Sequence, residues 1–379
     1  MTEDAATSVS TLPEEGPGPQ KAVGEELPAV EGTHEASILG RIEVLSSEFV
    51  AGWASASPEG SYSYVVAKLR SDILGVAKAR FNRDDLEQAR FSGTLNAYAF
   101  TIAFDHPIDP KDINSVSVHS PSTNTPFPRN RNITFDRSPP LRVFVLGSPR
   151  SGTSELARTL ADQLSLPWDG EGHAGSRFAK AAQALQGEFN SSNNMLHFID
   201  QQRVRDLVVT AAKQTYFSVH SSASFIDKTP GLSMVKSAPF LSECFPDAYF
   251  IFMRRNPIAN ILSRMAKFGG VFEEHCQDWA ASMESWLAVR EKVPHQIEIE
   301  QERMLSKPLE VGAELASFLG VPEKAPEIGA SLALGRCEWT GQGLGKDSLT
   351  DTDWTRGQME TFLRYCGPVM ANFGYDLGP

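Results

Sequence analysis

The chain has 379 residues, of which 41% are hydrophobic and 22% charged, so it is long enough for two globular domains. Its formal net charge of -12 argues against broad nucleic-acid binding, which depends on neutralising phosphates with Lys and Arg. A small anionic ligand held in a local basic pocket remains compatible with this charge.

Residues 1–37 are rich in Glu, Pro, Gly, Ala and Ser and show no hydrophobic periodicity. They contain eight acidic residues and a single lysine, so more than half of the net negative charge lies here. This composition predicts a disordered acidic tail. It lacks the apolar region of a signal peptide, and no apolar run in the chain is long enough for a transmembrane segment.

Residues 38–134 show the alternation of apolar and polar positions that is typical of half-buried strands, for example over residues 65–69. Turn residues separate these runs, as in S-P-E-G at residues 57–60. One short helix is expected over residues 82–89, with Asn82 as its N-cap. We predict a small antiparallel β-sandwich that serves as an accessory domain, followed by a proline-rich linker over residues 126–140.

Residues 140–379 alternate strands with helices, which indicates an α/β domain with a parallel, P-loop-like sheet flanked by helices. Residues 141–146 are apolar except for Arg142, and residues 248–253 predict a second buried strand. Asn256 and Pro257 form a favoured pair for the N-cap and first position of a helix. Further helices are expected over residues 154–164, 273–292 and 308–319.

The segment G-S-P-R-S-G-T-S at residues 147–154 joins the first of these strands to its helix. Gly147 and Gly152 keep the G-x-x-x-x-G spacing of a phosphate-binding loop, in which backbone N–H groups and a helix N-terminus favour an anion. The lysine of a nucleoside triphosphate site is missing, since Thr153 follows the second glycine. The cation within the loop is Arg150, so an ATP or GTP site is disfavoured.

The loop P-R-S-G-T-S resembles the 5′-phosphosulfate loop of the sulfotransferases that use 3′-phosphoadenosine 5′-phosphosulfate (PAPS), especially their bacterial and protein-tyrosine members. The sequence Arg255-Asn256-Pro257, with Ser263 eight residues after the arginine, is similar to the family's 3′-phosphate motif. The segment I-D-K-T-P around Lys228 resembles the D-K-T-P segment of bacterial members. A partial resemblance continues to the C-terminus, where the pattern C-G-x-x-M-x-x-x-G-Y begins at Cys366.

This resemblance implies PAPS as the sulfuryl donor and no metal. Loop amides and hydroxyls would hold the 5′-phosphosulfate, Arg150 and Lys228 would stabilise the transferring group, and Arg255 and Ser263 would bind the 3′-phosphate. A glycine loop at residues 341–346 would close over the nucleotide. The donor-binding residues expected in this way are Ser148, Pro149, Arg150, Ser151, Gly152, Thr153, Ser154, Arg255, Ser263, Gly343 and Lys346.

A general base must take the proton of the acceptor. In the relatives it is a glutamate shortly after the first helix, and Glu171 in the sequence W-D-G-E-G-H matches it best. His173 has the intrinsic pKa nearer to neutrality, so Glu171 is favoured but His173 stays open. Asp169 could instead orient one of these two candidate bases. The catalytic residues expected are Arg150, Glu171, His173 and Lys228.

The acceptor expected from fold-level analogy is a glycan or glycolipid, with another lipid or hydroxyl compound left open. Two other functions stay open, namely a P-loop small-molecule kinase and a non-catalytic glycan-binding protein. The four cysteines form no C-x-x-C pair and no zinc pattern, which favours a reduced, cytoplasmic setting. The oligomeric state cannot be read from the sequence.

Overall fold

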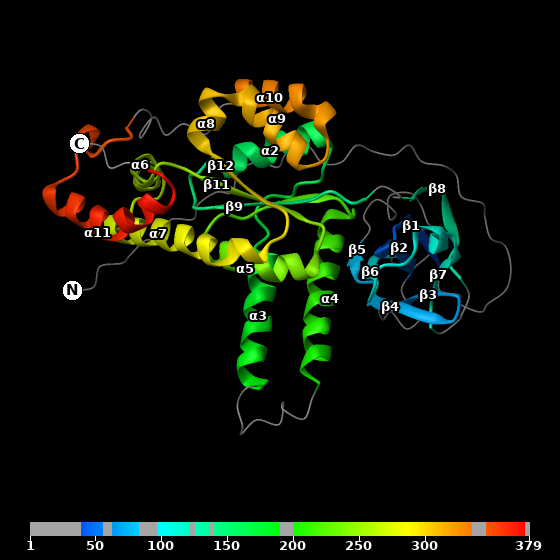
Figure 1. Cartoon of the computed structure of the whole chain (residues 1–379). Coiled ribbons are helices and arrows are strands. Elements are labelled where there is room, and N and C mark those ends of the chain that lie inside the picture. Colours follow the sequence, from blue (N-terminus) through cyan, green and yellow to red (C-terminus); the bar gives the residue numbers. More distant parts are fainter. Residues whose placement is uncertain are drawn as a thin grey trace, which may run out of the picture.

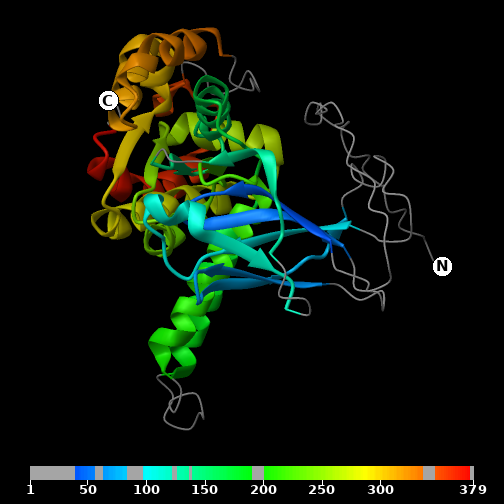
Figure 2. The same cartoon turned by 90° about the vertical axis from the view of Figure 1, so that its right-hand side faces the viewer.

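The computed structural model describes residues 39–55, 63–82, 97–121, 126–135, 139–189, 200–335 and 346–375 (Figure 1). The acidic tail that was predicted to be disordered lies outside these residues. Within them, a pair of small sheets lies beside a parallel sheet that is covered by helices, and one helical hairpin projects away from that sheet (Figures 1 and 2).

The N-terminal part is a β-sandwich, as predicted. One sheet has the order β5-β6-β2-β1-β8 and the other the order β4-β3-β7. Apolar side chains from both sheets, including Ile42, Val65 and Phe100, form their common core. The elements are β1 (Gly40–Leu45), β2 (Phe49–Ser55), β3 (Tyr64–Leu69), β4 (Asp72–Lys78), β5 (Phe81–Asn82), β6 (Ala97–Ala103), the 3-10 helix η1 (Pro110–Ser115), β7 (Val116–His119) and β8 (Arg129–Phe135).

Two local predictions for this part were wrong. The expected linker contains strand β8, which pairs parallel to β1, so the sandwich is not purely antiparallel. The prolines of this stretch lie outside β8 and remove no hydrogen-bond donor from it, and the carbonyl of Pro128 accepts a bond from Ile42 N at 3.0 Å. Asn82 belongs to strand β5 instead of capping a helix, and residues 83–89 lie outside the described residues.

The C-terminal part is built on a sheet of four parallel strands in the order β10-β9-β11-β12. Alternate residues of β9 enter two different cores: Phe144 and Leu146 lie on one side of the sheet, and Val143 and Val145 on the other. A strand buried on both faces needs a continuous apolar run, which is why it stood out in the sequence. The strands are β9 (Arg142–Gly147), β10 (Phe225–Lys228), β11 (Tyr249–Arg254) and β12 (Gln296–Glu300).

Helices cover both faces of this sheet (Figure 1). The core on one side takes side chains from α2 (Thr153–Leu164), α8 (Gln301–Ser306), α9 (Pro308–Phe318) and α10 (Ala325–Leu334). The core on the other side takes them from α3 (Ala174–Phe189), α4 (Gln201–His220), α5 (Leu232–Cys244), α6 (Pro257–Phe268), α7 (Phe272–Val289) and α11 (Arg356–Asn372). Short 3-10 turns are η3 (Arg290–Lys292), η4 (Pro322–Lys324) and η5 (Leu349–Asp351).

These helices confirm most of the helical predictions. Asn256 caps α6 through its side chain, and Pro257 is the first residue of that helix. The stretch expected as one helix over residues 273–292 divides into α7 and η3. No helix among the described residues is both long and apolar enough to cross a membrane.

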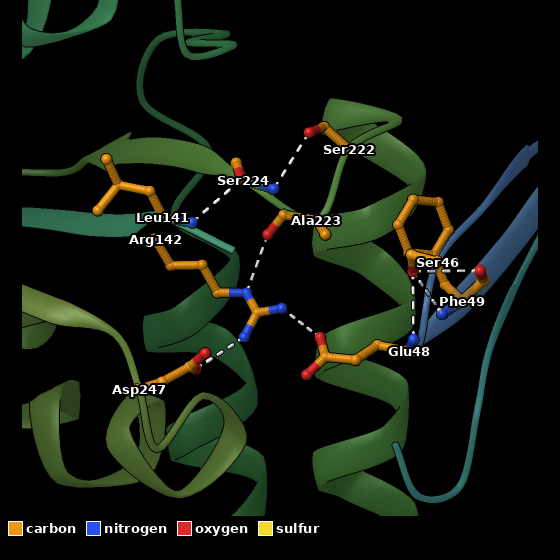
Figure 3. Close-up of polar contacts among 9 residues, drawn as sticks. All are labelled: Ser46, Glu48, Phe49, Leu141, Arg142, Ser222, Ala223, Ser224 and Asp247. Atoms are coloured by element: carbon orange, nitrogen blue, oxygen red, sulfur yellow. Dashed lines mark hydrogen bonds and ion pairs between the residues drawn. The ribbon is translucent and has the colours of Figure 1, made fainter. Parts of the chain in front are cut away.

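The sandwich is joined to the parallel sheet through a buried arginine (Figure 3). Arg142 begins β9, and only 1% of its side chain is exposed. Its Nε donates to the carbonyl of Ala223 at 2.9 Å, and Nη1 donates to Asp247 at 2.8 Å. Its Nη2 pairs with Glu48, in the turn between β1 and β2. The guanidinium is therefore held by both parts of the molecule.

Apolar and amide contacts extend this junction along α4. The ring of Phe49 stacks on that of Phe217 with centroids 4.8 Å apart, and both belong to one core. The side chain of Gln214 accepts a hydrogen bond from Ala103 N at 2.6 Å and donates one to the carbonyl of Thr101. Within the described residues, strand β5 pairs only with Tyr98 and Ala99 of β6, and helix α4 bonds to the other end of that strand. We therefore expect the sandwich and the helical part to unfold together.

We expect Glu48→Ala to lower the free energy of unfolding by about 2 kcal/mol, because it leaves the buried guanidinium of Arg142 with one carboxylate fewer. The remaining contact to Asp247 keeps the loss below the roughly 3–5 kcal/mol typical of breaking a buried pair. Urea denaturation would measure it. Glu360→Ala, which removes an exposed pair with Arg356, is the control and should change stability by less than about 0.5 kcal/mol. Equal effects of the two substitutions would contradict the structural role of Arg142.

Candidate active site

The four parallel strands end at one edge of their sheet, and the residues singled out in the sequence follow these ends. The loop of residues 147–154 leaves β9, Lys228 is the last residue of β10, and Arg255 follows β11 directly. The carboxyl edge of a parallel sheet is where α/β proteins bind their ligands. The candidate site is therefore this edge.

The loop after β9 depends on glycine at two positions. A Cβ atom on Gly147 would lie 2.4 Å from the carbonyl oxygen of Met253 on the neighbouring strand, and its φ is 146°. Gly152 has a φ of 85° and precedes α2 without a side-chain cap. The first amides of α2 are thus directed at the loop, where an anion would satisfy them. Arg150 adopts a left-handed φ of 71° within the same turn.

Helix α6 supports the loop with a fully buried amide. Asn260 lies four residues after the cap Asn256, on the face of α6 that meets the loop. Its Nδ2 donates to the carbonyl of Pro149 and to Ser151 Oγ, both at 3.0 Å. Contacts from α6 therefore stabilise the loop conformation without a bound ligand.

A second support is the buried side chain of Arg264, one turn further along α6. Its Nη1 donates to Ser148 Oγ at 3.1 Å, while Nη2 pairs with Asp278 at 2.7 Å and Nε contacts His275 Nδ1 at 3.2 Å. Burial lowers the pKa of Arg264, and Asp278 opposes that change. Neither Asn260 nor Arg264 was predicted as a site residue. Their spacing from Asn256, four and eight residues, is the signal that places them on the loop side.

Arg150, Arg255 and Ser263 come together as one cluster. Arg150 Nε donates to Ser263 Oγ at 3.1 Å, and Arg255 Nη1 donates to the carbonyl of Arg150 at 2.9 Å. The arginine of the first motif thus contacts both residues of the second motif. The three residues are therefore in contact, and their roles remain predictions.

A small cavity of about 60 Å³ adjoins this cluster. The first two turns of α2 form one wall and contribute Arg158, which was not predicted and pairs with Glu155 at 3.6 Å. Three guanidinium groups against one carboxylate give the cavity a net positive charge, which suits an anion such as a phosphate. Its lining residues are Arg150, Gly152, Thr153, Ser154, Glu155, Arg158, Arg255 and Gln301.

The C-terminal segment reaches the N-terminus of α6. Asn256 Nδ2 lies 3.4 Å from the carbonyl oxygen of Asp347, so the neighbouring Lys346 lies near the cluster of the second motif. Lys346 Nζ lies 3.7 Å from the exposed Asp353. Gly343, which was predicted to close over the nucleotide with Lys346, lies outside the described residues.

Lys228, Glu171 and His173 form a second cluster at the end of β10. The ammonium of Lys228 pairs with Glu171 Oε1, and His173 Nε2 lies 4.0 Å from the other carboxylate oxygen. The side chain of Lys228 is only 5% exposed, whereas that of Glu171 is 42% exposed. Lys228, which was predicted to act on the transferring group, therefore lies with both candidate bases, and Glu171 is the one in direct contact with it.

Buried polar contacts fix the residues beside Lys228. Asp227 accepts hydrogen bonds from Tyr216 OH at 2.5 Å and from Thr229 Oγ1 at 3.0 Å. Burial raises the pKa of the Asp227 carboxyl group, and these two hydrogen bonds act in the opposite direction. The backbone on both sides of Lys228 is therefore anchored, which sets the direction of its side chain.

Asp169 does not orient either candidate base, contrary to one reading of the sequence. Its Oδ2 lies 2.8 Å from Nδ1 of His220, near the end of α4. Burial lowers the pKa of His220, while Asp169 raises it. His220 also stacks on Phe225 with centroids 4.7 Å apart, so the pair closes the end of α4 against the sheet. No pattern in the sequence predicted that Asp169 and His220 would be in contact.

Comparison with known proteins finds a family that matches the part of the chain containing this sheet edge. Residues 140–325 match the model of the sulfotransferase family. Nodulation protein NoeE from Sinorhizobium fredii is 31% identical over 159 residues, a stretch that covers 39% of this chain. The match spans 37% of the length of that relative, well under half of it.

Two sulfotransferases are among the solved structures that match part of the chain. The sulfotransferase domain of the Synechococcus PCC 7002 olefin synthase is 19% identical, with a TM-score of 0.41 over 64% of this chain and 98% of that domain. Sulfotransferase STF9 from Mycobacterium avium is 16% identical, with a TM-score of 0.37 over 63% of this chain and 79% of the other. A sugar kinase from Janibacter sp. HTCC2649 is 19% identical, with a TM-score of 0.28 over 49% of this chain and 98% of the kinase.

Proposed function

The chain belongs to the sulfotransferase family through its residues 140–325, and on this premise we propose that it transfers a sulfuryl group from PAPS to a hydroxyl group of an acceptor. The observation that carries the proposal is that two clusters of predicted site residues lie at the same edge of the parallel sheet. Arg150, Ser263 and Arg255 form the first, and the Lys228–Glu171 pair belongs to the second.

The first cluster and the loop suit the donor. We assign the 5′-phosphosulfate to the amides of residues 151–154 and to the hydroxyls of Thr153 and Ser154, because a glycine loop at a helix N-terminus favours such an anion. We assign the 3′-phosphate to Arg255 and Ser263. Arg150 donates from its guanidinium to Ser263, so we assign this group to the 3′-phosphate as well as to the sulfuryl end.

The second cluster suits the transfer step. The acceptor oxygen attacks the sulfur in line, the bond from sulfur to the bridging phosphate oxygen breaks, and adenosine 3′,5′-bisphosphate leaves. Glu171 takes the acceptor proton, because it is the candidate base that contacts Lys228 directly. The ammonium of Lys228 stabilises the negative charge on the equatorial and bridging oxygens. No metal is needed in this scheme because PAPS already carries a good leaving group.

The setting of the reaction is part of the proposal. We assign catalysis to residues 140–379 and an accessory role to the sandwich of residues 38–134, with a glycan or glycolipid as the acceptor. Cys244, Cys276 and Cys366 are free and buried, which suits a reducing compartment such as the cytoplasm.

Donor recognition is tested by thermal unfolding with nucleotides. At about 100 times its dissociation constant, adenosine 3′,5′-bisphosphate should stabilise the protein by roughly 2.7 kcal/mol, which raises the Tm by about 5–10 °C. ATP with Mg²⁺ should leave the Tm unchanged, because the loop has Thr153 where a triphosphate site needs lysine. Stabilisation by ATP with Mg²⁺ alone would instead favour a small-molecule kinase.

A further inference from the structure

A second cavity, of about 440 Å³, opens between α3 and α4 where these helices leave the sheet. The two helices run side by side (Figure 1), and the hairpin that they form projects from the sheet in both overall views (Figures 1 and 2). The volume of the cavity is within the range of small-molecule sites. None of the residues that line it was predicted as a donor-binding or catalytic residue.

The cavity exists because two small side chains lie on the face of α3 that is turned toward α4. Ala174, Phe178 and Ala181 lie at positions i, i+4 and i+7 of α3, so they share one face of that helix. Tyr216 and Val219 line the cavity from α4. The two alanines cannot fill the space between the helices, which leaves a hollow with apolar walls.

The cavity adjoins the proposed chemistry. Gly170 and Gly172 line it and flank Glu171 in the chain, and Asp227 lines it and precedes Lys228. The cavity is thus lined by the chain neighbours of the Glu171–Lys228 pair, although neither member of the pair lines it. The hydroxyl group of a bound molecule can face Glu171 while its body stays between the helices.

Two pairs of polar side chains in the cavity are engaged with each other, and the cation that also lines it, Arg177, is exposed. Tyr216 OH bonds to Asp227, and the imidazole of His220 bonds to Asp169. Few hydrogen-bonding partners remain for a ligand, and a buried sugar hydroxyl without a partner is unfavourable. Apolar groups fill such a space without this penalty.

We propose that this cavity binds the acceptor through an apolar group, so that the substrate is an amphipathic alcohol, with its hydroxyl on or next to an alkyl or aryl body, and not a free sugar. This inference rests on the proposed sulfuryl transfer and narrows its acceptor. The open end of the cavity at the exposed Val219 leaves room for a polar remainder in solvent.

Matched probes test this inference on the full chain loaded with adenosine 3′,5′-bisphosphate. Octyl β-D-glucoside, below its micellar concentration, and methyl β-D-glucoside share one sugar and differ in their apolar group, and 2-naphthol supplies an aryl body. Calorimetric titration should give octyl glucoside a Kd at least tenfold lower than methyl glucoside, together with saturable binding of 2-naphthol. Equal affinity of the two glucosides, or no saturable binding of octyl glucoside and 2-naphthol, would overturn the inference.

A variant pair on α4 locates the binding. Val219 and Leu207 are both exposed apolar residues of this helix, at 56% and 63%, but only Val219 lines the cavity. Val219→Glu should raise the Kd for octyl glucoside at least tenfold, while Leu207→Glu should change this Kd less than twofold. Ala181→Trp, which fills the cavity from α3, should act like Val219→Glu. Unchanged binding in both cavity variants would place the ligand elsewhere.

The donor site serves as an independent check. If the bisphosphate stabilises the protein but the apolar probes do not bind, only the acceptor inference fails. If the apolar probes bind but the bisphosphate does not stabilise the protein, the cavity assignment stands as an apolar site and the proposed function fails.

Discussion

Arg150→Ala should reduce kcat/KM for PAPS by at least about 10²–10³-fold, because it removes a charged donor from the site where negative charge must be stabilised. The fold should survive. The backbone contact from Arg255 to the carbonyl of residue 150 needs no side chain, and alanine adopts the left-handed φ of 71° about as poorly as arginine does. Labelled sulfur transfer, with any acceptor that the protein accepts, measures the effect.

The separate changes in KM for PAPS and in kcat then show which end of the donor the guanidinium of Arg150 contacts. If Arg150 serves the 3′-phosphate together with Ser263, the KM for PAPS should rise more than kcat falls, whereas contact with the sulfuryl group lowers kcat. Arg150→Lys should restore part of the activity, and Arg356→Ala, at an exposed pair, should have none of these effects. Parent-like turnover of Arg150→Ala with an intact fold would refute its role.

Glu171→Gln should lower kcat by about 10²–10⁴-fold, because the amide keeps the shape of the side chain but cannot accept the acceptor proton. His173→Gln should stay within about threefold of the parent, since the imidazole lies 4.0 Å from Glu171 and makes no contact with Lys228 that the structure records. Initial rates of the two variants at saturating PAPS compare them directly. A large loss in His173→Gln with near-normal turnover of Glu171→Gln would transfer the base to His173.

The elements that sequence reasoning found are those with an unambiguous pattern. Strands β9 and β11 are continuous apolar runs, and helix α6 starts with an Asn-Pro cap. Strand β10 was not singled out as an element because half of its sequence F-I-D-K is charged, and only tertiary hydrogen bonds keep Asp227 buried. Strand β8 was taken for a linker because of the prolines around it.

The site shows the same division. Motif spacing predicted that Arg255 and Ser263 lie together, and it assigned Arg150 to the sulfuryl end of the donor. The structure brings Arg150 into contact with both. The buried supports Asn260 and Arg264 were not found, since an amide and an arginine inside a helix resemble surface residues in a sequence. The cavity between α3 and α4 was equally hidden, because it is formed by residues about 40 positions apart that only the packed hairpin brings together.

The account is tested most directly by following PAPS itself. The full chain, PAPS labelled with ³⁵S and a panel of amphipathic alcohols and glycans should yield labelled acceptor and adenosine 3′,5′-bisphosphate in equal amounts, without added metal. Arg150→Ala should yield neither above background. If the parent leaves PAPS unchanged with every acceptor but consumes ATP in the presence of Mg²⁺, the chain is not a PAPS-dependent sulfotransferase.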